Sequence, residues 1–226
     1  MILITADKAY QLVQNLAYDN KDNFNKFEPF FDHSHMTAGI ARDVAEKLGL
    51  NPEEAHIAGM LHDVGKCFTA DKKTRTFHEI VGARYIAERG LSWGISDSQE
   101  QCYKLAQIAR SHFIVYEQFQ LAKEGEPSHQ PWLPGLEDTN TELLLPNTWN
   151  EFILIYADMM RNMGLKEVSL EYRLADIEER DRKTCNPRLL AIEKAKPRLL
   201  QIKEDIESAI QESLNKKVDL SKHPLL

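Results

Sequence analysis

The chain has 226 residues and a formal net charge of −7, with 42% hydrophobic and 28% charged residues. This length and composition are typical of a globular protein with a substantial core, and the negative charge offers no basic surface for duplex nucleic acid, so we expect no such partner. The three cysteines are odd in number and widely spaced, which argues against a disulfide framework and favours a reducing compartment. Residues 1–7 lack the basic flank of a signal peptide, and no apolar segment approaches the ~20 residues that span a bilayer. We therefore expect a cytoplasmic protein with no membrane partner.

Two amphipathic helices are expected in the N-terminal quarter of the chain. Residues 5–20 carry apolar side chains at helical spacing, with Thr5 or Asp7 as the N-cap. From His33 to Leu48 apolar residues again repeat at intervals of three and four, and Gly49 suits a helix C-cap. This pattern predicts that His33 lies in the first turn of the second helix.

A third helix is expected to end in a polar pair. Asn51 is its expected N-cap, and an apolar stretch then runs to His62 and Asp63, which are followed by Lys66. Burying an imidazole and a carboxylate without partners costs several kcal/mol. Two interpretations of this stretch are open: a metal ion satisfies the pair, or the helix end leaves it in water.

The middle of the chain is expected to contain two further helices, each with one histidine. His78 opens the first, and the second is predicted from Ser98 to about Phe119, with His112 inside it. A charged loop, residues 67–76, precedes them. Residues 123–148 are rich in proline and longer than most connections, so we expect a functional loop that borders the active site.

The last third of the chain is also expected to be helical. An apolar helix from Trp149 to Met163 contains Asp158, whose burial would require either a salt bridge to Arg161 or a metal ion. Residues 188–217 show a narrow apolar stripe that would dock on the main domain or pair with a second subunit in a homodimer. Pro197 predicts a kink or a break in that helix.

The expected fold class is all-α, because the pattern indicates few strands. We divide the chain into a site-bearing domain, residues 1–170, and a C-terminal helical extension, residues 171–226. The extension shows no residues that suggest chemistry.

A histidine or an aspartate recurs in these helices in an order that resembles the HD superfamily of metal-dependent phosphohydrolases, over roughly residues 28–165. The local contexts match as well: a His-Ser that opens an Ala-rich helix ending in Leu-Gly-Leu, then Leu-His-Asp-Val-Gly-Lys, His-x-x-x-Gly-Ala and Ala-Asp-x-x-Arg. The resemblance implies an HD-domain helical bundle with six metal ligands: His33, His62, Asp63, His78, His112 and Asp158. His35 is an alternative to His33, and alignment of the following helix with the family pattern favours His33.

The resemblance further implies two ions that share Asp63. One would be held with His33, His62 and Asp158, and the other with His78 and His112. Imidazole and carboxylate ligands without thiolates suit Fe, Mn, Ni, Co or Zn, with Mg as a further candidate. Two ions ~3.5–4 Å apart can share a hydroxide and bind the oxygens of an in-line displacement at phosphorus. We therefore predict a dinuclear centre of divalent transition metals.

The expected activity is metal-dependent hydrolysis of a nucleotide-like phosphate ester or anhydride through a metal-activated hydroxide. Asp63 and Lys66 are the expected catalytic residues, and Lys66 would meet the substrate phosphate as a point charge. A surface lysine at a helix end is the alternative for Lys66. Arg161 would either bind substrate phosphate or orient Asp158.

The substrate is less well defined than the site. The six-ligand pattern resembles the HD-type dinucleoside tetraphosphatases and also the cyclic-dinucleotide phosphodiesterases. The phosphodiesterases carry a His-His-Glu element and a Gly-Tyr-Pro signature, whereas His78-Glu79 lacks the preceding His and no Gly-Tyr-Pro follows. The alternatives are therefore a cyclic-nucleotide phosphodiesterase, or a regulatory HD module that binds a nucleotide without turnover.

Overall fold

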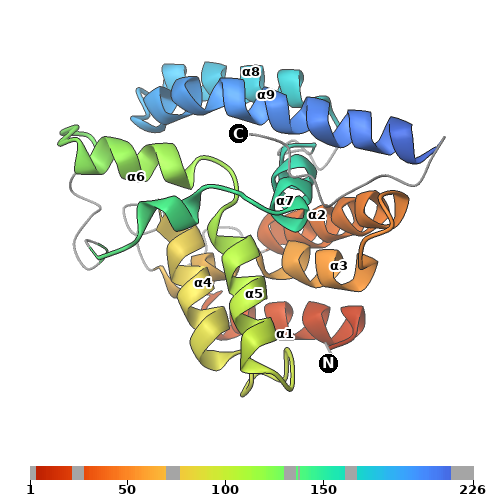
Figure 1. Cartoon of the computed structure of the whole chain (residues 1–226). Coiled ribbons are helices and arrows are strands. Elements are labelled where there is room, and N and C mark those ends of the chain that lie inside the picture. Colours follow the sequence, from red (N-terminus) through yellow and green to blue (C-terminus); the bar gives the residue numbers. More distant parts are fainter. Residues whose placement is uncertain are drawn as a thin grey trace.

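Helices make up the fold in the part of the chain that the computed structural model describes, which is residues 4–21, 28–69, 77–129, 136, 138–160 and 167–214. No extended strand occurs in these ranges, so the all-α prediction is confirmed (Figure 1). The elements are α1 (Ala6–Asp19), α2 (Glu28–Lys47), α3 (Pro52–Leu61), the 3-10 helix η2 (Val64–Phe68), α4 (His78–Arg89), α5 (Gln99–Arg110), α6 (Val115–Lys123), the 3-10 helix η5 (Thr141–Leu144), α7 (Trp149–Met159), α8 (Leu170–Lys183) and α9 (Arg188–Ser213). Within this part of the chain no helix is long and apolar enough to cross a bilayer.

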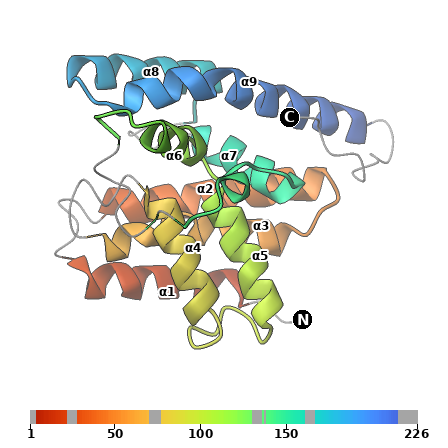
Figure 2. The same ribbon diagram turned by 60° about the vertical axis from the view of Figure 1, so that its left-hand side comes forward.

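The C-terminal helices α8 and α9 run side by side across the end of the bundle opposite α1 (Figures 1 and 2). One hydrophobic cluster joins them to α2 and α7 through side chains from all four helices. Its members include Leu174, Ile192, Leu199 and Ile206 together with Val44, Phe152 and Ile155. The apolar stripe of α9 therefore docks on the main body, which is one of the two alternatives expected from the sequence.

Two predicted helix boundaries are wrong, and one of two alternatives at Pro197 is excluded. Helix α2 begins at Glu28, so His33 lies in its second turn and not its first. The single helix expected over residues 98–119 is two helices, because α5 ends at Arg110 and Phe113 adopts a left-handed backbone with φ 55°. Helix α9 is continuous through Pro197, so the break considered there does not occur.

Two glycines allow the close packing that assembles the centre of the bundle. A Cβ at Gly59 on α3 would lie 2.5 Å from the Cα of Ala38, so α2 and α3 approach at backbone distance there. A Cβ at Gly65 on η2 would overlap the carbonyl oxygen of His78, which ties η2 to the first turn of α4. Glycine at both positions lets neighbouring elements bring their polar side chains together.

Candidate metal centre

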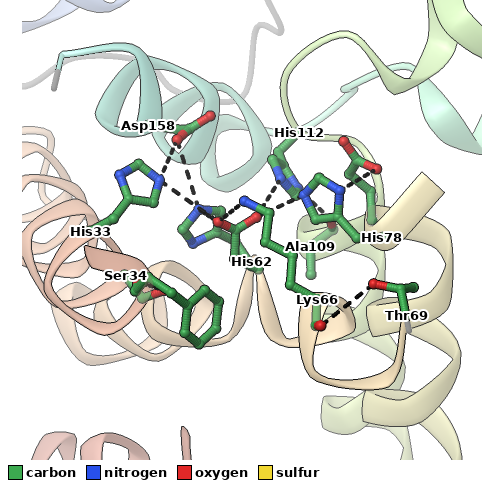
Figure 3. Close-up of polar contacts among 12 residues, drawn as sticks. His33, Ser34, His62, Lys66, Thr69, His78, Ala109, His112 and Asp158 are labelled. Carbon is green, nitrogen blue, oxygen red and sulfur yellow. Dashed lines mark hydrogen bonds and ion pairs between the residues drawn. The ribbon is translucent and has the colours of Figure 1, made fainter. Parts of the chain in front are cut away.

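The first group of polar residues is His33, His62 and Asp158, which come from α2, the end of α3 and α7 (Figure 3). The Nε2 atom of His33 lies 2.9 Å from Oδ1 of Asp158, and that of His62 lies 3.8 Å from the same oxygen. One ligand atom from each residue lies within 4.8 Å of the other two. The three side chains therefore converge on one point although 125 positions separate the first from the last.

The second group is His78, His112 and Glu79, which come from the first turn of α4 and the turn after α5 (Figure 3). Their ligand atoms also lie within 4.8 Å of one another. The Nδ1 atom of His78 lies 3.3 Å from Oε2 of Glu79, so the carboxylate faces the far side of that imidazole.

Asp63 lies between the two groups and gives one oxygen to each. Its Oδ2 atom lies 3.8 Å from Nε2 of His33 and 3.5 Å from Nε2 of His62. Its Oδ1 atom lies 2.8 Å from Nε2 of His78 and 3.6 Å from Nε2 of His112. The carboxylate is 1% exposed, so the centre is buried at its middle.

Backbone carbonyls set the orientation of two of the imidazoles. The Nδ1 atom of His62 donates to the Gly59 carbonyl at 2.7 Å, and that of His112 donates to the Ala109 carbonyl at 2.6 Å. A carbonyl can only accept, so the proton lies on Nδ1 and the Nε2 lone pair is directed toward Asp63 whenever the ring is neutral. In each case the ring bonds the carbonyl three residues before it at the end of a helix. This contact holds both rings in the tautomer whose Nε2 can bind a cation.

The electrostatics of the two groups differ. Burial lowers the pKa of His62 to about 3 against the raising effect of Asp63, so this ring is neutral at ordinary pH. Burial also opposes charge on His112, but the hydrogen bond to Asp63 and the nearby Glu79 raise its pKa to about 9. Burial opposes ionisation of both Asp63 and Asp158. Lys66 and the nearby imidazoles nevertheless hold the pKa of Asp63 well below its usual range, and His33 with the other imidazoles lowers the pKa of Asp158 in the same way.

Comparison with known proteins agrees with this arrangement. The model of the HD domain family matches residues 30–144, about half of the chain, which include every residue of the centre except Asp158. The chain belongs to the HD domain family. A ribonuclease Y from Opitutus terrae is 39% identical over 70 residues, which are 31% of this chain and only 13% of that protein's length. No solved structure was found to match the chain.

HD domains are generally metal-dependent hydrolases, and the centre of this HD domain fits a metal. The Nε2 atom of His62 is fully buried and has no hydrogen-bond partner in the described part of the chain, although it is directed between two ionised carboxylates. An orphaned buried lone pair is costly unless a cation or a donor satisfies it. Imidazole nitrogens combined with carboxylate oxygens suit a divalent transition metal.

The other residues predicted for the site are distributed as follows. The ammonium of Lys66 contacts Oδ2 of Asp63, and the Lys66 side chain is 32% exposed. His35 turns away from the centre and packs edge-on against Tyr10, with ring centroids 5.3 Å apart. Arg161 lies outside the described residues, as do residues 70–76 of the charged loop.

The described portion of the proline-rich segment 123–148 includes η5, whose Leu144 packs with Phe77 and Ile80 in a small hydrophobic cluster. Phe77 directly precedes His78, so this segment packs beside the start of α4, which carries His78 of the second group. The expectation that it borders the active site stays a prediction.

Glu79 was missed by the sequence analysis as a member of the centre. Adjacent residues on a helix diverge, and this argues against two neighbours sharing one site. Glu79 nevertheless is buried in the first turn of α4, with Oε2 3.3 Å from Nδ1 of His78. An acidic residue in a first helical turn beside a candidate ligand was the available signal.

Proposed function

We propose that this HD domain hydrolyses the phosphate ester or anhydride of a nucleotide-like substrate with two divalent metal ions. The first ion would be held by the first group and Oδ2 of Asp63, and the second ion by His78, His112 and Oδ1 of Asp63. The observation that carries the proposal is the division of Asp63, whose two oxygens face different pairs of imidazoles. A carboxylate that served only as a hydrogen-bond acceptor would not need four imidazoles around it.

The bound ions would supply Lewis acidity, which activates a water molecule and neutralises phosphate oxygens. The residues of the chain provide the geometry for this chemistry. Gly59 and Ala109 carbonyls hold the Nε2 lone pairs of two rings toward the centre. Burial of Asp63 and His62 keeps bulk water from competing for their ligand atoms.

Lys66 has two features that support a role in substrate binding. Its ammonium forms an ion pair with Asp63 at the centre, and its side chain is partly exposed to solvent. A phosphate oxygen that approached the centre would meet this charge as a point cation. Arg161 is proposed as a second cation for phosphate or for Asp158, on sequence grounds only.

The proposal is tested with purified protein loaded with Mn²⁺ and offered mononucleotides, dinucleoside polyphosphates and cyclic nucleotides. The name of the ribonuclease Y relative makes short single-stranded RNA a further substrate to include. We expect metal-dependent hydrolysis of at least one class, lost in His62→Ala and retained in His35→Ala, because His35 lies outside the centre.

Calorimetry of the same ligands distinguishes hydrolysis from binding alone. Nucleotide binding without turnover for every metal and substrate class would contradict the proposal and favour a regulatory HD module. Hydrolysis that persists in His62→Ala would show that the activity does not depend on this centre.

A further inference from the structure

The turn between α5 and α6, residues 111–114, carries His112 on a backbone that few residues with a side chain adopt. Phe113 has φ 55°, in the left-handed region that an aromatic residue rarely occupies. His112 directly precedes this residue and faces Asp63, while Phe113 packs against the hydrophobic cluster shared by α2, α7, α8 and α9. The position of His112 therefore depends on whatever holds the Phe113 backbone in place.

Arg198 on α9 makes that contact from 85 positions away in the sequence. Its Nη2 donates to the Phe113 carbonyl at 2.8 Å. The same guanidinium binds both oxygens of Glu117 in the first turn of α6, with Nε at 2.9 Å and Nη2 at 2.8 Å. One planar group thus holds the turn at Phe113 and at the start of the following helix.

The Arg198 contact is shielded from solvent. The Arg198 side chain is 11% exposed and that of Glu117 is 8% exposed. Packing of Ala195 before it and of Leu199 and Ile202 after it anchors this part of α9 in the core. The backbone of Arg198 is held by the core and its guanidinium by Glu117. Its hydrogen bond to the Phe113 carbonyl therefore costs little additional side-chain entropy.

We propose that Arg198 is a positioning residue for the second metal ion, acting through the Phe113 carbonyl to hold His112 at the centre. This inference rests on the two-ion function proposed above. It gives the C-terminal extension a role in the chemistry of the HD domain, although none of its residues was expected to have one. Helix α9 supports the first group only indirectly, through apolar packing against α7.

The test is a calorimetric titration with Mn²⁺ alone, comparing wild-type protein, Arg198→Met and Arg188→Met. Asp158→Asn and His112→Ala assign the two binding steps. Arg188 is the matched control because it makes a similar two-point contact with Asp181, at 2.8 and 3.0 Å, within the same extension. We expect Arg198→Met to weaken the second ion roughly 10- to 100-fold, the range seen when a partner that orients a ligand is removed, and to change the first ion less than twofold. Arg188→Met is expected to change neither step.

Loss of stability is separated from loss of positioning by a second variant, Arg198→Met/Glu117→Leu. Replacing both members of a buried ion pair with apolar residues restores folding stability in many proteins. We expect this variant to melt close to the wild-type temperature and still to bind the second ion weakly. Recovery of the second ion in the double variant would overturn the proposal, as would an equal loss of both ions in Arg198→Met.

Amide hydrogen exchange of the metal-free protein provides a readout that does not depend on ion binding. Faster exchange over residues 112–118 is expected in Arg198→Met and not in Arg188→Met. Unchanged exchange would mean that Arg198 does not hold the turn. A wild-type titration with a single step would contradict the two-ion function instead, and with it the role at a second ion, while the exchange result would still decide whether the contact orders His112.

Discussion

The two groups of the metal centre are built in different ways. The first group comes from three helices: His33 lies in the second turn of α2, His62 at the C-terminal end of α3 and Asp158 in the last turn of α7. Helices α2 and α3 approach at backbone distance at Gly59. The second group comes from the start of α4, which packs on Gly65 of η2, and from the turn after α5, whose Phe113 carbonyl accepts from Arg198 of α9. A site on packed helices keeps its geometry with few additional interactions, whereas a site on a turn requires them.

The charge states follow the same division. Burial leaves His62 neutral, with its pKa lowered to about 3, so the first group is ready for a cation. His112 carries a proton in the metal-free protein, because Asp63 and Glu79 raise its pKa to about 9 against the effect of burial. We infer that the first group binds its ion more readily and that the second group is the point where occupancy can vary.

Asp63→Asn is expected to have the largest effect, because it removes the charge of the carboxylate that faces both groups. We expect both ion-binding steps to weaken and kcat/KM to fall by roughly 10³-fold or more, since several kcal/mol of charge stabilisation is lost. Calorimetry with Mn²⁺ and steady-state kinetics measure the two quantities.

Two control variants define that result. Asp43→Asn removes an exposed carboxylate of α2 and is expected to behave as wild type. Asp158→Asn is expected to weaken the first ion alone. If Asp63→Asn also weakened only one ion, Asp63 would not bridge the two groups.

The first group was the more predictable from sequence. His33, His62 and Asp158 each lie within or at the end of an apolar helical pattern, and a helix of known periodicity constrains where such a side chain lies. The choice of His33 over His35 came from family resemblance. Their separation in the structure has a simple physical cause, because residues two apart on a helix face different directions.

The second group shows where local pattern fails. His112 was placed inside a continuous helix because apolar residues before and after it keep helical spacing. The helix instead ends at Arg110. The Nδ1 atom of His112 bonds to the Ala109 carbonyl, and Phe113, whose carbonyl accepts from Arg198, has a left-handed backbone. No window of sequence around His112 contains Arg198, so propensity and periodicity could not reveal the turn.

The docking of α9 was limited by the same lack of long-range information. Its apolar stripe was correctly assigned to a helix, but the pattern alone does not indicate which part of the protein packs against it. The structure supplies the partner, a cluster that includes Phe152 and Ile155 of α7.

A pair of glycine variants tests the support of each group with the same substitution, the addition of one Cβ atom. Gly65→Ala would push η2 away from the first turn of α4, and we expect the second ion to weaken roughly 10- to 100-fold, as for lost support of a ligand. Gly59→Ala would separate α2 from α3, which carry His33 and His62, and is expected to weaken the first ion by a similar factor. Titration with Mn²⁺ measures both.

Gly39→Ala is the control for these variants, because a Cβ there meets nothing within 4 Å and alanine favours the helix. We expect unchanged binding and a slightly higher melting temperature. If Gly65→Ala and Gly59→Ala weakened the same ion, the two groups would not be separate structural units.

The two ions are also expected to differ in the pH dependence of their binding. Metal binding requires a neutral imidazole, so a proton on His112 competes with the second ion below pH 9. The apparent affinity for the second ion should therefore rise roughly tenfold per pH unit between pH 6 and 9, for one proton released, and then level off. The first ion should change less, because His62, Asp63 and Asp158 have already lost their protons in that range. Equal slopes for the two ions would show that His112 is not the group that releases the proton.

The same proton links pH to the stability of the metal-free protein. The pKa of His112 is raised on folding from an ordinary value near 6.5 to about 9. A raised pKa means that the folded state binds the proton more tightly, so this contribution is complete below pH 6.5 and disappears as the pH rises through 9. Thermal unfolding without metal should therefore show a melting temperature that falls between pH 7 and 9.5, and His112→Gln should flatten that fall because its side chain does not titrate. Saturating Mn²⁺ should flatten it as well, because the bound ion replaces the proton between His112 and Asp63.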